Sequence, residues 1–173
     1  MTSTFKTDLE YSNHIESYLC NIINESGFKA ITTKDKKLFP DYDIIINSST
    51  DKKTIEVKVD KKCEQTGNIA VEVKKEINGE EKQSGLSITK ADVWIYYLPN
   101  EDEFYYLQTK KLMKNKNKGF RYVWGGDNNS SRMILFKIDV FKSLCKKINK
   151  DNIKIDVLRI LHPTIFDKQL NNN

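Results

Sequence analysis

The sequence predicts a single α/β domain in which helices flank a central mixed sheet, although the order of elements alone also allows an α+β domain. Three observations support this. The chain of 173 residues fits one hydrophobic core. An amphipathic helix is followed by several adjacent β-branched runs and then by further helices and strands. No linker is long enough to divide the chain. We therefore expect one domain over residues 1–173, with a core of about residues 8–110 and a C-terminal elaboration of about residues 111–168.

The amino-terminal half is predicted to contain one helix and a series of strands. Leu9, Ile15 and Leu19 recur at helical spacing within residues 8–26, and Gly27 follows as a stop signal. Beyond the helix, a charged, glycine-bearing loop is expected at residues 78–85, and the short segment 87–91 fits one helical turn capped by Ser87. Strands rich in β-branched or alternating residues are expected at 28–32, 42–46, 54–59 and 68–73.

The carboxyl-terminal half mixes strands and short helices. Strands are expected at 93–98, 104–108 and 133–138, a basic helix at 109–116, a loop at 125–131, and a helix capped by Asp139 that reaches about residue 148. Segment 153–161 fits either a strand or a helix. Phe120, Tyr122 and Trp124 alternate with other residues beside several lysines, a mixture that also occurs in nucleic-acid-binding surfaces. We interpret these aromatic residues as the packed side of a strand.

The composition excludes several classes of protein. A net charge of +5 and a pI of about 8.9 permit a polyanionic partner without demonstrating one. Three cysteines with no CxxC pair, and only two histidines, argue against a zinc site and favour reduced thiols. No apolar run approaches the roughly 20 residues of a membrane helix, and the first residues lack the apolar core of a secretory signal. The expectation is a cytosolic protein with no membrane contact.

The stretch Phe39–Asp60 contains the residues best suited to catalysis. In the strand predicted at 54–59, Glu56 and Lys58 share one face, and the aliphatic residues between and beside them share the other. Asp43, at the start of the preceding strand, can lie near Glu56 across the ladder. Two carboxylates form a hard-oxygen site suited to Mg²⁺ or Mn²⁺, and a lysine can hold an attacking water or neutralise charge on a phosphate. The pattern is short, and an ordinary solvated strand face has the same spacing.

This stretch resembles the signature of the PD-(D/E)xK nuclease superfamily, which has the restriction-endonuclease-like fold. The resemblance is closest to Holliday-junction-resolvase-like and phage-type nuclease domains. The literal Pro40–Asp41 is present, but Asp43, which precedes an isoleucine and lies thirteen residues before Glu56, fits the metal aspartate of the family better. Asp41 is the alternate. The resemblance implies that Glu56 is the second metal ligand and that Lys58 is the catalytic lysine.

The resemblance extends over about residues 10–98. Such nucleases often carry a glutamate on the first helix, and Glu16 lies eleven positions before the glycine that ends it. Glu16 would assist the metal directly or through water, although an ordinary surface position fits as well. Downstream, a strand containing Glu72, a Ser-Gly loop and Lys90 also resemble the family. Glu72 is then an outer carboxylate or a solvated edge charge, and Lys90 contacts a phosphate or is a surface lysine.

The function implied by the resemblance is Mg²⁺-dependent (or Mn²⁺-dependent) hydrolysis of phosphodiester bonds in DNA, most simply by an endonuclease. Lys90, Lys110 and Lys111 are the lysines expected to contact the DNA. Two cuts across a duplex would favour a homodimer, for which the sequence shows no interface. Two alternatives stay open: a catalytically inactive nuclease-like module for nucleic-acid binding or assembly, and a structural domain whose ExK pattern is accidental.

Overall fold

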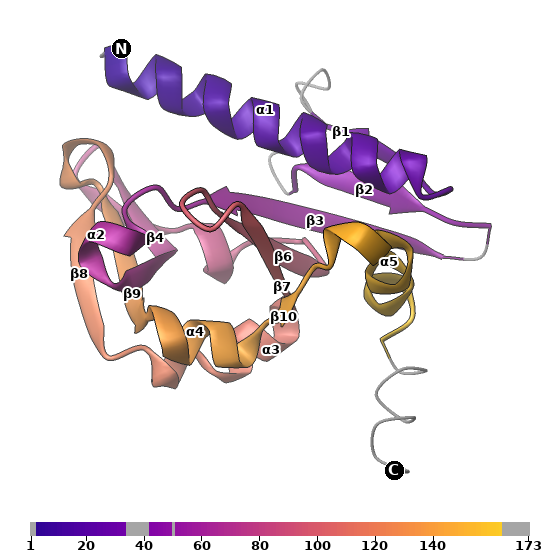
Figure 1. Cartoon of the computed structure of the whole chain (residues 1–173). Helices are drawn as coiled ribbons and strands as arrows, with labels where there is room; N and C mark the ends of the chain where they lie inside the picture. The colour runs from indigo at the N-terminus through magenta and orange to yellow at the C-terminus, as the bar shows by residue number, and fades with distance from the viewer. Residues whose placement is uncertain (1–2, 34–41, 50, 164–173) are drawn as a thin grey trace.

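The computed structural model describes residues 3–33, 42–49 and 51–163, and these residues form two sheets (Figure 1). A six-stranded sheet has the order β1-β2-β3-β6-β7-β10, and a four-stranded sheet has the order β5-β4-β9-β8. The strands are β1 (Lys29–Thr32), β2 (Ile44–Asn47), β3 (Lys52–Val59), β4 (Asn68–Ile77), β5 (Glu80–Gln83), β6 (Val93–Leu98), β7 (Glu103–Gln108), β8 (Arg121–Gly125), β9 (Ser131–Lys137) and β10 (Lys146–Lys147). The helices are α1 (Ser3–Glu25), α2 (Cys63–Thr66), α3 (Thr109–Lys114), α4 (Ile138–Leu144) and α5 (Ile153–Leu161), with short 3₁₀ turns η1 (Gly85–Ser87), η2 (Lys116–Lys118), η3 (Asp127–Asn129) and η4 (Lys150–Asn152).

The six-stranded sheet is mixed, which confirms the predicted central mixed sheet flanked by helices. β3 pairs with β6 in parallel, whereas the other neighbours in this sheet are antiparallel. Parallel strands need a long crossover connection. Here residues 60–92 provide it, since they contain α2 and the β4–β5 hairpin.

Each face of the six-stranded sheet packs against its own apolar cluster. On one face, Ile46 and Ile55 pack with residues of α1 and α5. On the other face, Trp94 and Tyr96 pack with residues of α3, α4 and the four-stranded sheet. Figure 1 shows α1 on one side of the sheet and α3 and α4 on the other. Alternation along β6 therefore supplies both clusters, whereas β3 contributes apolar side chains only to the cluster under α1 and α5.

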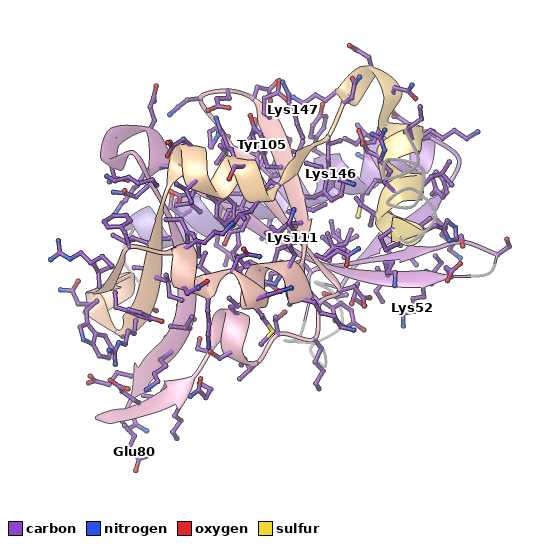
Figure 2. All side chains as sticks on the ribbon, turned by 90° about the horizontal axis from the view of Figure 1, so that it is seen from below. Lys52, Glu80, Tyr105, Lys111, Lys146 and Lys147 are labelled. Carbon is purple, nitrogen blue, oxygen red and sulfur yellow. The ribbon has the colours of Figure 1, made fainter. Side chains whose placement is uncertain are left out.

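The prediction of a loop at residues 78–85 is wrong, because this segment contains β5 and the turn of a hairpin. Asn78 and Gly79 both have positive φ angles, 55° and 79°. Asn-Gly is the preferred pair for a two-residue hairpin turn, so the sequence carried this signal. The hairpin projects from the body of the protein, with Glu80 at its tip (Figure 2).

Three shorter predictions are also corrected or decided by the structure. Ser87 is the last residue of η1 and does not cap a turn over residues 87–91. Asp139 lies in the first turn of α4, which ends at Leu144 because Lys146 and Lys147 pair with β7. Segment 153–161, left open by the sequence, is the helix α5. Within the described residues, no helix has the length and apolar character needed to span a membrane.

Two isoleucines on paired strands provide a matched test of the core. Ile46 on β2 is fully buried, whereas Ile31 on the neighbouring β1 is 41% exposed. We predict that Ile46→Ala lowers the free energy of unfolding by about 2–5 kcal/mol, because it removes buried atoms and leaves a cavity. Ile31→Ala should change it by no more than about 0.5 kcal/mol. Urea denaturation followed by circular dichroism measures both, and equal losses would contradict the assigned burial.

Candidate active site

Strand β3 presents Glu56 and Lys58 on the face that also carries Trp94 of β6. The Lys58 Nζ lies 2.6 Å from Glu56 Oε1, and the side chains are 40% and 14% exposed, respectively. The Lys58 ammonium is also 5.7 Å from the centre of the Trp94 ring. The pair therefore sits at the surface of the sheet, with the Glu56 side chain more recessed than that of Lys58.

Asp43 is fixed beside this pair by the backbone of β3. Its N–H donates to the carbonyl of Ile55 at 2.8 Å, and its Oδ2 accepts the N–H of Val57 at 2.7 Å. The backbone carbonyl of Asp43 is held as well, since it accepts a hydrogen bond from the Thr33 hydroxyl at 3.2 Å. The aspartate thus lies at the level of Glu56, as the sequence predicted. The alternate, Asp41, lies outside the described residues.

The charges of these groups act on one another. Burial raises the pKa of Glu56 above its ordinary value; the Lys58 ammonium opposes this, and the negative charges of Asp43 and Glu72 add to it. Burial alone would lower the pKa of Lys58, but Glu56, Asp43 and Glu72 outweigh it and raise that pKa. Lys58 is therefore a protonated cation at neutral pH, and three carboxylates surround it.

Glu72 on β4 is held toward this cluster by the Ser-Gly loop. The Ser84 hydroxyl donates to Glu72 Oε1, and the Ser84 N–H donates to the carbonyl of Val73 at 3.1 Å. Gly85 has a φ of +49°, and a Cβ there would lie 2.4 Å from the Glu72 carbonyl oxygen. Only glycine allows this close approach. Of the two interpretations offered by the sequence, the arrangement favours an outer carboxylate over a solvated edge charge.

Two further carboxylates occupy different environments. Asp60 follows β3 and accepts backbone N–H groups of Lys62 at 3.1 Å and Ala70 at 3.3 Å, so it ties β3 to β4. Glu16 is buried, at 7% exposure, on the side of α1 that packs on the sheet. This excludes the ordinary surface position that the sequence allowed for Glu16. Because α1 covers the face opposite Glu56, a role at the metal stays a prediction.

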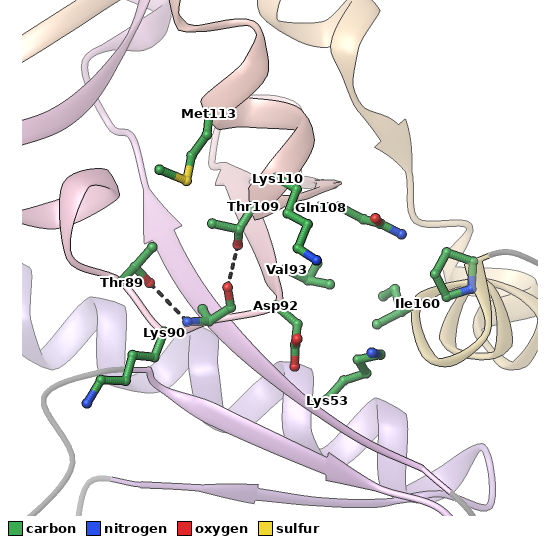
Figure 3. A pocket seen from close by; sticks show the side chains of 12 residues that line it. Lys53, Thr89, Lys90, Asp92, Val93, Gln108, Thr109, Lys110, Met113 and Ile160 are labelled. Atoms are coloured by element: carbon green, nitrogen blue, oxygen red, sulfur yellow. Dashed lines mark hydrogen bonds between the residues drawn. The ribbon is translucent and has the colours of Figure 1, made fainter.

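The three lysines expected to contact DNA are not brought to one place. Lys90 is exposed, and its carbonyl accepts from the hydroxyl of Thr54, which shares the face of Glu56. Lys90 and Lys110 border a cavity of about 350 Å³, where the Lys110 ammonium points inward with Lys53 and Lys90 extends away (Figure 3). Lys111 borders a different cavity, of about 130 Å³, near Lys146 (Figure 2). Lys90 is the one whose backbone contacts β3, the strand that carries Glu56 and Lys58.

The donor set fits a divalent cation bound partly by its substrate. Among the described residues, no three His, Cys, Asp or Glu side chains form a group able to hold a metal ion by themselves. Mg²⁺ commonly takes one or two carboxylates and completes its shell with water and phosphate oxygens. Asp43 and Glu56 are such a pair. Burial, with the nearby carboxylates, raises the pKa of Glu56, and a bound cation would stabilise its charged form.

The interpretation of Phe120, Tyr122 and Trp124 as the packed side of a strand is wrong. They are 51%, 54% and 44% exposed. The physical reason is that β8 is an edge strand of the four-stranded sheet and burial falls off toward that edge: Ile134 on β9 is 1% exposed, whereas Tyr122, its partner on β8, is 54% exposed. The alternation of these residues was visible in the sequence, but their place at an edge was not.

Comparison with known proteins adds information at the level of the fold. No family model matches this chain, and no curated protein sequence matches it either. Solved structures with a similar path of the chain include the Holliday junction resolvase of Archaeoglobus fulgidus (14% identity, 80% of this chain and 92% of that chain, TM-score 0.46). A bacterial homing endonuclease (15% identity, 74% and 77%, TM-score 0.47) and a nuclease from a fusselovirus (12% identity, 89% and 92%, TM-score 0.43) are also similar. All three of these proteins are nucleases.

The electrostatic interactions of Glu56 with Asp43 and Lys58 predict how the Glu56 carboxyl group titrates. We expect the Glu56 carboxyl carbon to titrate, by NMR, with a pKa above 4.5. Asp43→Asn should lower that pKa, because it removes a negative neighbour, and Lys58→Met should raise it further, because it removes the cation. Shifts of the opposite sign in these two variants would show that the three groups are not neighbours in solution.

Proposed function

We propose that this protein is a divalent-metal-dependent nuclease that hydrolyses phosphodiester bonds in DNA, with its active site at Asp43, Glu56 and Lys58. The observation that supports the proposal most strongly is the convergence of a backbone-anchored aspartate, a recessed glutamate and a protonated lysine on one sheet surface. This is the minimal set of groups for phosphodiester hydrolysis. If these residues were ordinary solvated surface charges, there would be no reason for the Val57 N–H to hold the Asp43 carboxylate beside Glu56 and Lys58.

The roles of the residues follow from their charges. Asp43 and Glu56 would hold Mg²⁺ or Mn²⁺, which supplies a polarised phosphate oxygen and a bound water of lowered pKa. Since the pKa of Lys58 is raised, its ammonium would donate to the attacking water or to a phosphate oxygen, and would not abstract a proton. Glu72 would hold the Lys58 ammonium toward the site, and Lys90 would contact a neighbouring phosphate.

Substitution of the Glu56–Lys58 ion pair tests the assignment. Glu56→Gln should remove a metal ligand and abolish cutting of plasmid DNA in Mg²⁺. Lys58→Met should lower the rate about 10²–10³-fold, the loss typical of removing one preorganised charge donor. Glu80→Gln and Lys82→Met are matched controls, because Glu80 and Lys82 form an exposed ion pair at 3.6 Å on the projecting hairpin. Both controls should cut at the wild-type rate.

Metal binding separates a nuclease from an inactive relative. Calorimetric titration with Mn²⁺ should show binding that weakens as the pH falls through the raised pKa of Glu56, since the protonated carboxyl is a poor ligand. Glu56→Gln should weaken binding at every pH. Absence of binding at millimolar Mn²⁺ would favour the alternative, a nuclease-like module that binds nucleic acid without cutting it.

A further inference from the structure

A row of exposed aromatic side chains follows the outer strand of the four-stranded sheet. Phe120, Tyr122 and Trp124 occur at every second position, so they share one face. Each ring is between 44% and 54% exposed. We call these three residues the aromatic strip. Contiguous exposed aromatic surface is uncommon on soluble proteins and marks interaction sites.

Cations accompany the aromatic strip. The guanidinium carbon of Arg132 lies 5.5 Å from the centre of the Tyr122 ring, and Lys137 Nζ lies 4.8 Å from that of Phe120. Arg132 is also 3.6 Å from the carboxylate of Glu81, the one acidic contact found at these cations in the described structure. Two of the three rings therefore have a cation placed over them, so positive charge lies directly against the aromatic strip.

The stretch of sequence that leads into and contains the aromatic strip carries no negative charge. Residues 104–126 contain no aspartate or glutamate. They contain six basic residues: Lys110, Lys111, Lys114, Lys116, Lys118 and Arg121. Lys116 and Tyr122 both border a cavity of about 240 Å³, with Leu86 and Ile134 in its wall. A polyanion with flat apolar groups fits this combination better than an acidic protein does.

We propose that the aromatic strip binds unpaired bases of a single-stranded nucleic acid by stacking, with its phosphates held by the neighbouring lysines and arginines. Exposed rings among cations are the arrangement that binds single strands without reading their sequence. A duplex hides the faces of its bases, so it contacts only the cations. That the ligand in the cell is DNA rests on the proposed nuclease function, but the stacking itself does not.

The test measures binding of a fluorescein-labelled 20-mer of thymidine in EDTA, which removes metal and stops any cutting. Tyr122→Ala and Trp124→Ala should each weaken binding about 5- to 150-fold, the loss that accompanies removal of one stacking ring. Trp124→Phe keeps an aromatic face and should bind within about threefold of the wild type. Ile31→Ala, an exposed apolar residue on the edge strand of the other sheet, should leave binding unchanged.

Tryptophan fluorescence reports the contact directly. The chain has two tryptophans, of which Trp94 is 1% exposed and Trp124 is 44% exposed. Stacking on Trp124 should quench the emission of the wild type, and the quenching should disappear in Trp124→Phe, although this variant still binds. A 20-base-pair duplex should compete at least tenfold less well than the single strand at equal salt.

Several results would overturn the proposal. These are absence of binding by the wild type, alanine variants that bind within twofold of it, or a duplex that competes equally. A dimer in sedimentation that Trp124→Ala converts to a monomer, with unchanged affinity for the oligonucleotide, would assign the aromatic strip to a second copy of the chain instead. The proposed function fails separately: cutting would be absent in Mg²⁺ while stacking in EDTA persists.

Discussion

The candidate active site depends on one constraint, the alternation of side chains along β3 while that strand is held between β2 and β6. Antiparallel pairing with β2 and parallel pairing with β6 fix the register on both sides. A slip of one residue would turn Ile55 and Val57 out of the core and bury Glu56 and Lys58 in it. The apolar cluster under α1 and α5 therefore enforces the direction of the charged pair.

The same constraint explains how surplus negative charge is tolerated. Glu56 is recessed at 14% exposure, with Asp43 and Glu72 acting on it and one ammonium opposing them. Holding carboxylates together costs free energy unless their oxygens are satisfied. Asp43 is compensated by the N–H of Val57, and Glu72 by the hydroxyl of Ser84. Backbone and loop groups thus stabilise an arrangement that side-chain charges alone would push apart.

The sequence predicted the parts of the fold that local patterns determine, and missed those that depend on distant pairing. Period-two alternation located β3, and the direction of Glu56 and Lys58 followed from it. The pair Asn78–Gly79 is a local signal for a hairpin turn, although the charged, glycine-bearing stretch around it was interpreted as a loop. By contrast, no local pattern says how far the buried part of the four-stranded sheet extends toward β8, so the exposure of Tyr122 could not be foreseen. The burial of Glu16 depends likewise on how α1 packs.

The four-stranded sheet connects the aromatic strip to the candidate active site. Glu72 pairs with Met133, and Met133 pairs with Val123, so the three residues form one row across β4, β9 and β8. Strands lie about 4.8 Å apart, which places the backbone of β8 about 10 Å from that of Glu72. Since Val123 alternates with Tyr122 and Trp124, their side chains leave the opposite face of the sheet from Met133. A nucleotide stacked on Tyr122 is therefore not the nucleotide whose phosphate would meet Lys58. The two surfaces would contact different segments of one nucleic acid, and binding at the aromatic strip would set affinity without taking part in the chemistry.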